Sequence, residues 1–177
     1  MTVRPACEED IPSIARVHVD SWRTAYRGIV ADSFLAALSY QKNEERHRRY
    51  MALPGAIYLA AESSQAGIVG FLSGGPERTG DRHFPGELNA IYILRPHRRH
   101  GIGRALVQEW AVTLRRAAIN AALVWVLAEN RPAIAFYERL GGKRLREQTI
   151  EIGGEPLKEL AYGWEDLRTL ECGVVKT

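Results

Sequence analysis

The sequence predicts a mixed α/β fold (α+β) in which a twisted mixed sheet of six to seven strands is flanked by about four helices. Two observations carry this prediction. Three apolar stretches separated by turn residues follow one another between residues 56 and 94, which is typical of an antiparallel meander. A strand–helix–strand–helix order follows between residues 87 and 140, which is typical of a right-handed crossover between parallel strands.

The chain opens with a short strand followed by a helix. Residues 2–6 predict the strand, and from about Glu8 apolar residues recur at near-helical spacing up to Trp22. The acidic residues at the start of this segment suit the first turn of a helix.

Two further helices are expected before the meander. The chain breaks at Gly28, and a short helix is expected to follow with Asp32 or Ser33 as its N-cap. Residues 40–53 predict a polar helix, and the stretch "RHRRY" at 46–50 is expected to be a solvated face of it. These segments should cover an edge of the sheet.

The meander consists of three stretches that read "AIYLAAE" (56–62), "GIVGFLSGG" (67–75) and "ELNAIYIL" (87–94). Small and polar residues separate them, as hairpin connections require. We expect three antiparallel neighbours.

The crossover uses a helix from Gly103 to about Ala118, which has one apolar face. The strand 122–128 that follows lacks alternation and should be buried on both sides. A second helix covers residues 131–140.

Two last strands complete the sheet, around residues 143–152 and 157–164, with Gly153 and Gly154 as the hairpin turn. The length of 177 residues and a hydrophobic content of 46% suit one domain with a real core. We therefore expect a single domain over 1–177, with a core at about 2–165 and a short tail at 166–177.

Composition limits the kind of ligand and the compartment. The formal net charge of +3 favours a small anionic ligand over a coating of polyanion. Cys7 and Cys172 show neither metal nor redox spacing, and no apolar leader or membrane-length apolar run is visible. A cytoplasmic protein with no membrane partner and no metal is expected.

The stretch "LRPHRRHGIGRALVQEW" (94–110) carries the chemistry. A strand runs into a glycine turn that opens a helix, so unpaired N–H groups and the positive end of the helix dipole converge there. That arrangement binds phosphate or pyrophosphate. Gly101 and Gly103 would let the backbone approach ligand oxygens, and neighbouring arginines would neutralise charge.

Spacing excludes two common phosphate sites. A dinucleotide fingerprint needs a third glycine where Leu106 stands. A nucleotide P-loop needs Lys followed by Ser or Thr where Arg104 and Ala105 stand.

The remaining pattern, Arg98-x-x-Gly101-x-Gly103, resembles the pyrophosphate turn of the GCN5-related N-acetyltransferase (GNAT) family. The stretch "VLAENRPAIAFYERLGG" (126–142) resembles a second motif of that family, in which an asparagine precedes a helix carrying a tyrosine. The order of elements matches from residue 2 to about 165. The resemblance implies the GNAT-like acyl-CoA N-acyltransferase fold.

The resemblance implies acetyl-CoA as co-substrate and assigns residues to it. The backbone of the strand before the turn would pair with the pantetheine arm, as in strand addition by a peptide. The turn would hold the pyrophosphate, and the second motif would line the pantetheine channel. The implied cofactor-binding residues are Ile91, Tyr92, Ile93, Arg98, Arg99, Gly101, Ile102, Gly103, Arg104, Asn130, Ala133, Phe136 and Tyr137.

The resemblance also implies direct attack of an amine on the thioester. The N–H of Ile91 would stabilise the oxyanion, and Tyr137 would be the acid for the departing thiolate. The base would be Glu87 or water. Alternation along the strand is expected to place the side chain of Glu87 on one face with Asn89, Ile91 and Ile93.

The amine acceptor should lie between the segments 20–28 and 77–86. Trp22 and Tyr26 are four residues apart on one helix face and would cage a cation or an aromatic group, and Asn89 would join them. Polarity would come from Asp20, Asp81 and His83.

Structural interpretations remain open beside these roles. The helical spacing of Trp22 and Tyr26 is more typical of core packing than of a ligand cage, and Tyr137 is compatible with a core aromatic residue. Glu87 follows Pro-Gly and is also compatible with a solvated turn residue.

The expected function is N-acetylation of a small-molecule primary amine. The alternatives are acetylation of a protein N-terminus or lysine, and a non-catalytic acyl-CoA sensor. A nucleic-acid-binding module using residues 95–104 is not favoured, because recognition motifs and interleaved aromatics are missing there. The resemblance implies a possible homodimer.

Overall fold

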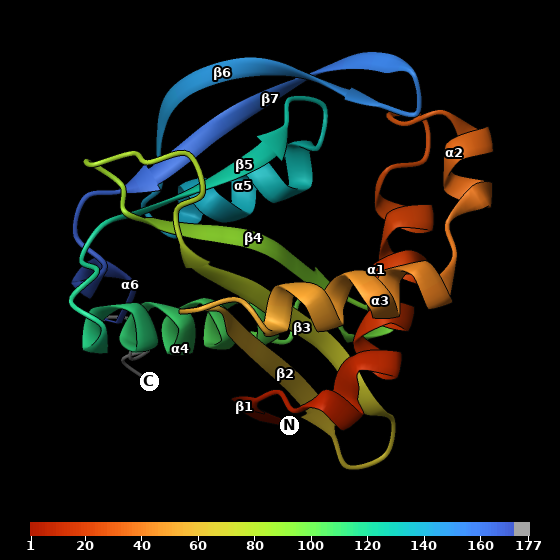
Figure 1. Cartoon of the computed structure of the whole chain (residues 1–177), viewed down its shortest axis with the longest axis horizontal. Coiled ribbons are helices and arrows are strands. Elements are labelled where there is room, and N and C mark those ends of the chain that lie inside the picture. Colours follow the sequence, from red (N-terminus) through yellow and green to blue (C-terminus); the bar gives the residue numbers. More distant parts are fainter. Residues whose placement is uncertain (172–177) are drawn as a thin grey trace.

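The computed structural model describes residues 1–171, which form one seven-stranded sheet in the order β1-β2-β3-β4-β5-β7-β6 (Figure 1). The strands are β1 (Thr2–Pro5), β2 (Ile57–Ser63), β3 (Gly67–Pro76), β4 (Gly86–Ile93), β5 (Ala122–Leu127), β6 (Lys143–Ile152) and β7 (Glu155–Trp164). The helices are α1 (Ile11–Ala25), α2 (Asp32–Ala37), α3 (Tyr40–Met51), α4 (Ile102–Arg116), α5 (Arg131–Arg139) and α6 (Arg168–Glu171), with 3₁₀ turns at Glu8–Asp10 and Arg95–His97.

Strand pairing confirms the predicted mixed sheet. The strands β1 to β4 pair antiparallel in sequence order, which is the expected meander. The strands β4 and β5 are parallel and are connected through α4. The last hairpin turns at Gly153 and Gly154, whose φ values of +64° and +85° suit glycine, and β7 lies between β5 and β6.

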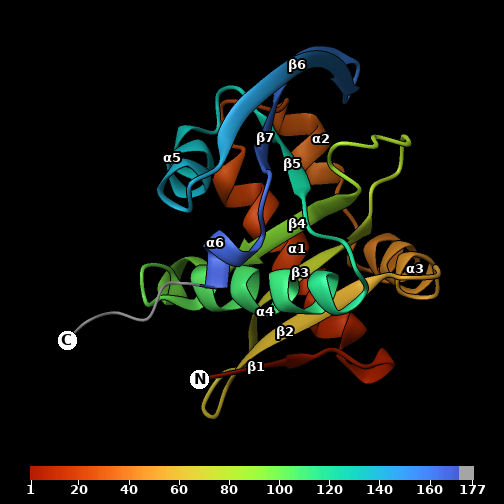
Figure 2. The same ribbon diagram turned by 90° about the vertical axis from the view of Figure 1, so that its left-hand side faces the viewer.

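Helices cover both faces of the sheet (Figures 1 and 2). The helix α4 packs on one face through fully buried Leu106 and Trp110, in the same cluster as Leu72 of β3. The helix α1 packs on the opposite face through Ile14 and Val17, against Phe71 of β3. Because successive strand residues point to opposite faces, β3 contributes to both cores.

Three expectations about the helices were wrong. The fold has six helices within residues 1–171 rather than about four. The N-cap of α2 is Ala31, with Asp32 already inside the helix. The solvated face expected at 46–50 is wrong for His47, which is only 3% exposed because α3 packs on α1.

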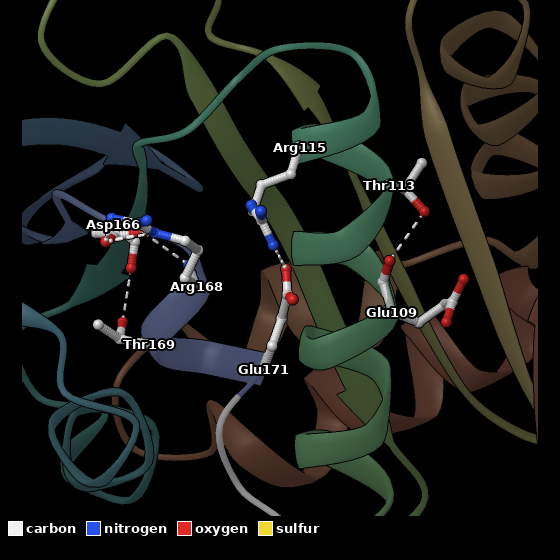
Figure 3. Close-up of polar contacts among 7 residues, drawn as sticks. All are labelled: Glu109, Thr113, Arg115, Asp166, Arg168, Thr169 and Glu171. Carbon is white, nitrogen blue, oxygen red and sulfur yellow. Dashed lines mark hydrogen bonds and ion pairs between the residues drawn. The ribbon is translucent and has the colours of Figure 1, made fainter.

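The predicted C-terminal tail begins with ordered structure. Leu167 and Leu170 are buried, and α6 is joined to α4 by an ion pair between Glu171 and Arg115 (Figure 3). In the same view Thr169 donates a hydrogen bond to the carbonyl oxygen of Asp166 at 2.7 Å. The predicted remainder of the tail, including Cys172, lies outside the described residues.

Within residues 1–171, no helix is long and apolar enough to cross a membrane. Over the same range, no three His, Cys, Asp or Glu side chains cluster in a way that would hold a metal ion.

Candidate functional site

The site lies where β4 and β5 separate (Figure 1). Their parallel pairing ends at Leu88 and Val124, although β4 continues to Ile93 and β5 to Leu127. At the same point β4 carries a bulge against β3, since the pairs skip Asn89. A bulge adds one unpaired residue and bends its strand, which helps β4 diverge from β5 and opens cavities on both sides.

The bulge also corrects the predicted faces of β4. An extra residue reverses which face the following side chains occupy. Leu88 and Ile91 therefore both pack toward α4, whereas Glu87 and Tyr92 line the opposite side. The prediction that the side chains of four β4 residues lie on one face was therefore wrong; these residues are Glu87, Asn89, Ile91 and Ile93.

One cavity, of about 450 Å³, lies between β4, β5, the glycine turn and α5, and we call it the turn cavity. Every residue that the resemblance assigned to the cofactor lines it. These residues are Ile91, Tyr92, Ile93, Arg98, Arg99, Gly101, Ile102, Gly103, Arg104, Asn130, Ala133, Phe136 and Tyr137.

The backbone of β4 presents unpaired groups to the turn cavity. The N–H of Leu94 donates to the carbonyl oxygen of Val69 at 2.9 Å, which fixes the alternation of hydrogen bonds to β3. The N–H groups of Ile91 and Ile93 therefore point away from β3, into the gap beside β5. The N–H group of Tyr92 points toward β3 instead, so it does not face the gap beside β5.

The two turn glycines are required for different reasons. Gly101 is the N-cap of α4 with a φ of +79°, a left-handed conformation that favours glycine, and a Cβ there would meet open space. A Cβ on Gly103 would lie 3.2 Å from the ring of Phe136. From the sequence, close approach of the backbone to ligand oxygens was the expected reason for both glycines.

The N-terminus of α4 is open to an anion. No side chain caps it, so its first N–H groups have no helical acceptor. Arg98 is held beside it, because its Nε donates to the carbonyl oxygen of Ile93 at 2.8 Å. Burial lowers the pKa of Arg98, with a smaller contribution from Arg95.

Tyr137 lies on α5 with 5% of its surface exposed, close to Phe136 and Trp164. Burial and the neighbouring Tyr26 raise the pKa of its phenol. The hydroxyl is therefore protonated at neutral pH, and it has no hydrogen-bond partner among residues 1–171. It is a free proton donor at the wall of the turn cavity.

Asn130 has a structural role in addition to lining the turn cavity. It is the N-cap of α5, and its Oδ1 accepts a hydrogen bond from the N–H of Ala133 at 3.3 Å. Capping fixes the start of the helix that carries Tyr137.

A second cavity, of about 1090 Å³, opens on the other side of β4, and we call it the aromatic cavity. Trp22, Tyr26 and Asn89, the residues expected to bind the acceptor, all line it, and the rings of Trp22 and Tyr26 are 4.6 Å apart. Tyr26 and Asn89 line both cavities, as does Tyr92, whose hydroxyl lies 3.1 Å from that of Tyr26. The two cavities therefore meet at these residues.

The polar groups expected around the acceptor have other partners. Asp20 accepts a hydrogen bond from Tyr40 at 2.7 Å, and Asp81 forms an ion pair with Arg146 at 2.7 Å. Neither they nor His83 line the aromatic cavity.

Glu87 is buried, with 2% of its side chain exposed, so the solvated interpretation is wrong. Its two carboxylate oxygens accept from Nε and a terminal nitrogen of Arg78, at 2.9 Å and 2.5 Å. This pairing raises the pKa of Arg78. Arg78, which was not among the predicted site residues, reaches Glu87 from the loop between β3 and β4.

Two buried histidines also line the aromatic cavity and were missed. Nδ1 of His18 lies 3.0 Å from Nε2 of His47, whose Nδ1 lies 3.2 Å from the hydroxyl of Tyr58. Burial lowers the pKa of His18 to about 3 and that of His47 to about 4. The signal for His18 was present, because it follows Ile14 by four residues on the apolar face of α1.

Comparison with known proteins was consistent with this geometry. The profile described as "Acetyltransferase (GNAT) family" matches residues 19–142. A protein of Bacillus subtilis (strain 168), named "Uncharacterized N-acetyltransferase YuaI", is 40% identical over 171 residues, covering 97% of this chain and 96% of its own.

Solved structures share the fold. A ribosomal-protein-alanine N-acetyltransferase from Brucella melitensis superposes with a TM-score of 0.73 at 23% identity, covering 93% of this chain and 99% of its own. The protein yncA from Salmonella typhimurium, solved with its cofactor acetyl-CoA, gives 0.70 at 18% identity and 94% of both chains.

Proposed function

This chain belongs to the GNAT family and is an N-acetyltransferase, and from that premise we propose that it transfers the acetyl group of acetyl-CoA directly to a primary amine of a small molecule. The observation that carries the proposal is the turn cavity. It combines an unpaired strand edge, an uncapped helix N-terminus and a free tyrosine hydroxyl in one space.

The residues of the turn cavity fit acetyl-CoA. The N-terminus of α4 with Arg98, Arg99 and Arg104 suits the charge of a pyrophosphate. The free N–H groups of Ile91 and Ile93 suit the amides of the pantetheine arm. The solved relative with acetyl-CoA supports this assignment.

Bound acetyl-CoA supplies an activated acetyl thioester. The N–H of Ile91 donates to the carbonyl oxygen, which becomes negative as the amine nitrogen bonds to the carbonyl carbon. Tyr137 then gives its hydroxyl proton to the departing sulfur as the carbon–sulfur bond breaks. Burial keeps this phenol protonated, so its proton is present when the sulfur departs.

The proton lost by the amine goes to Glu87 by way of a water molecule. Arg78 engages both carboxylate oxygens, and each oxygen keeps a further lone pair for a water. Both Glu87 and the shared residue Asn89 line the aromatic cavity, where the acceptor would enter.

A small molecule is favoured as acceptor by the form of the aromatic cavity. Its volume is about 1090 Å³, close to the upper end of small-molecule sites, and aromatic side chains from several elements converge on it. A protein N-terminus or lysine is the rival within the same chemistry.

The test is thiol release from acetyl-CoA in the presence of small amines, amino acids, aminoglycosides and N-terminal peptides. We expect thiol release with a small amine, and mass spectrometry should detect acetylated amine in an amount equal to the thiol released. Turnover with peptides alone would move the assignment to protein acetylation. Tight CoA binding without turnover of any acceptor would favour a sensor.

We also propose that the chain acts as one domain in the cytoplasm, as a homodimer. The continuous sheet supports the single domain. Cell fractionation and sedimentation would test the compartment and the dimer, and a membrane-bound or monomeric protein would contradict them.

A further inference from the structure

Glu159 of β7 projects into the aromatic cavity from the last hairpin. It pairs with Leu127 of β5 on one side and with Gln148 of β6 on the other. Directly paired residues of antiparallel strands point to the same face. Glu159 therefore shares its face with these two side chains, and all three line the cavity.

Apolar and aromatic side chains line the cavity beside Glu159. Leu127 belongs to a packed cluster that includes Trp22, Tyr26 and Phe34, and Trp125 lines the cavity from the same strand. Aromatic faces attract organic cations, and a carboxylate among them strengthens that attraction.

Glu159 has no ion-pair partner among residues 1–171, although it is partly buried. Its one hydrogen bond comes from Nε2 of Gln148 at 3.2 Å. Burial raises its pKa, while Arg78 and Glu87 act on it in opposite directions without contact. Partly buried carboxylates are normally paired.

Other carboxylates of this cavity are already engaged by the protein. Glu77 accepts two backbone N–H bonds within its loop, and Glu87 is held by Arg78. Glu147 forms ion pairs with Arg144 and Lys158. These groups have less need of a ligand than Glu159.

The lining as a whole also favours a cation. It contains five carboxylates and three guanidinium groups, although the chain carries a net charge of +3. Two of those guanidinium groups, Arg78 and Arg146, are in ion pairs, and Arg46 lies 5.5 Å from the ring of Tyr50.

We propose that Glu159, with the rings of Trp22 and Tyr26, binds a second ammonium group of the acceptor, so that the preferred substrates are diamines or polyamines. The reacting amine lies where the two cavities meet, near Tyr26 and Tyr92. This inference rests on the proposed function, since it assigns the acceptor of that reaction.

The test compares putrescine with butylamine, which has the same carbon chain and a single amine. The wild-type enzyme should favour putrescine in kcat/KM, and Glu159→Gln should lower that value about tenfold, as for loss of one charge-assisted contact. The Glu159→Gln variant should keep kcat/KM for butylamine and the KM for acetyl-CoA within about twofold of the wild-type values. Glu151→Gln, an exposed carboxylate of the same cavity, is the matched control and should change neither.

Putrescine binding to the complex with CoA, measured by calorimetry, separates this inference from the proposed function. Weakened binding in Glu159→Gln supports the second-ammonium site even if no amine is acetylated. An equal loss of kcat/KM for both amines would overturn the inference. Putrescine binding that is unchanged in the variant would also overturn it. Thermal unfolding of each variant checks that the fold is kept.

Discussion

The two cavities that meet beside β4 are built in different ways. The turn cavity comes mainly from three stretches of chain, residues 88–104, 124–126 and 130–139, and backbone groups are its most specific features. The aromatic cavity draws side chains from α1, α2, α3 and six strands. One is set by local sequence, and the other by long-range packing.

This difference separates what can vary from what cannot. Phosphate binding at a helix N-terminus needs glycines and a turn, so its residues follow one another in the chain. An acceptor pocket of side chains from distant elements can change its charge and shape without altering the turn. We therefore expect variants of each cavity to affect one substrate and not the other.

The largest expected effect is a fall in the free energy of unfolding at acid pH, caused by the two buried histidines of the aromatic cavity. Burial lowers the pKa values of His18 and His47 to about 3 and about 4, below the unfolded value of about 6.5. The unfolded chain therefore takes up protons first as the pH falls. Their contribution is complete above pH ~6.5 and declines toward pH ~4, by about 3 kcal/mol for each histidine over this window.

Urea unfolding at a series of pH values measures this effect. His47→Gln should flatten the fall in the free energy of unfolding between neutral and acid pH. An equally steep fall in the variant would show that other groups cause it.

The next effect sharpens the role of the turn cavity. Tyr137→Phe removes the proton donor and keeps the ring, so kcat should fall at least about tenfold while CoA binding is unchanged. Tyr162→Phe is the control, because its hydroxyl donates to Glu138 at 3.0 Å and does not line either cavity. Equal activity in Tyr137→Phe and wild type would remove Tyr137 from the mechanism.

The sequence predicted the strand order of the meander, the crossover and the residues of the turn cavity because these depend on local periodicity and motif. It missed the bulge at Asn89, which alternation along one strand cannot reveal. That single residue reversed the predicted face of Glu87 relative to Ile91. Arg78 and Glu159 were missed for a related reason, because their environments are created by other strands.

A smaller effect tests the backbone of the glycine turn. Gly101→Ala places a side chain at a φ of +79° and should cost about 1 kcal/mol in stability. It should also raise the KM for acetyl-CoA several-fold. Gly67, the first residue of β3, has a similar φ of +66° and an equally open surrounding, so Gly67→Ala should share the first effect alone. Equal KM values in both variants would argue against cofactor binding at this turn.

The smallest expected effect is a difference in stability between the two variants that break the ion pair of Arg78 and Glu87. Arg78→Gln leaves a buried carboxylate without its cation, whereas Glu87→Gln leaves a guanidinium that is 52% exposed. We expect Arg78→Gln to be the more destabilising by about 1 kcal/mol in urea unfolding. The opposite order would mean that Glu87 has another partner.

The most direct test of two cavities with separate substrates is a parallel measurement of both KM values in Gly101→Ala and Glu159→Gln. We predict that Gly101→Ala raises the KM for acetyl-CoA and leaves that for putrescine unchanged, and that Glu159→Gln does the reverse. If each variant raised both values equally, the division of the site between the turn cavity and the aromatic cavity would be contradicted.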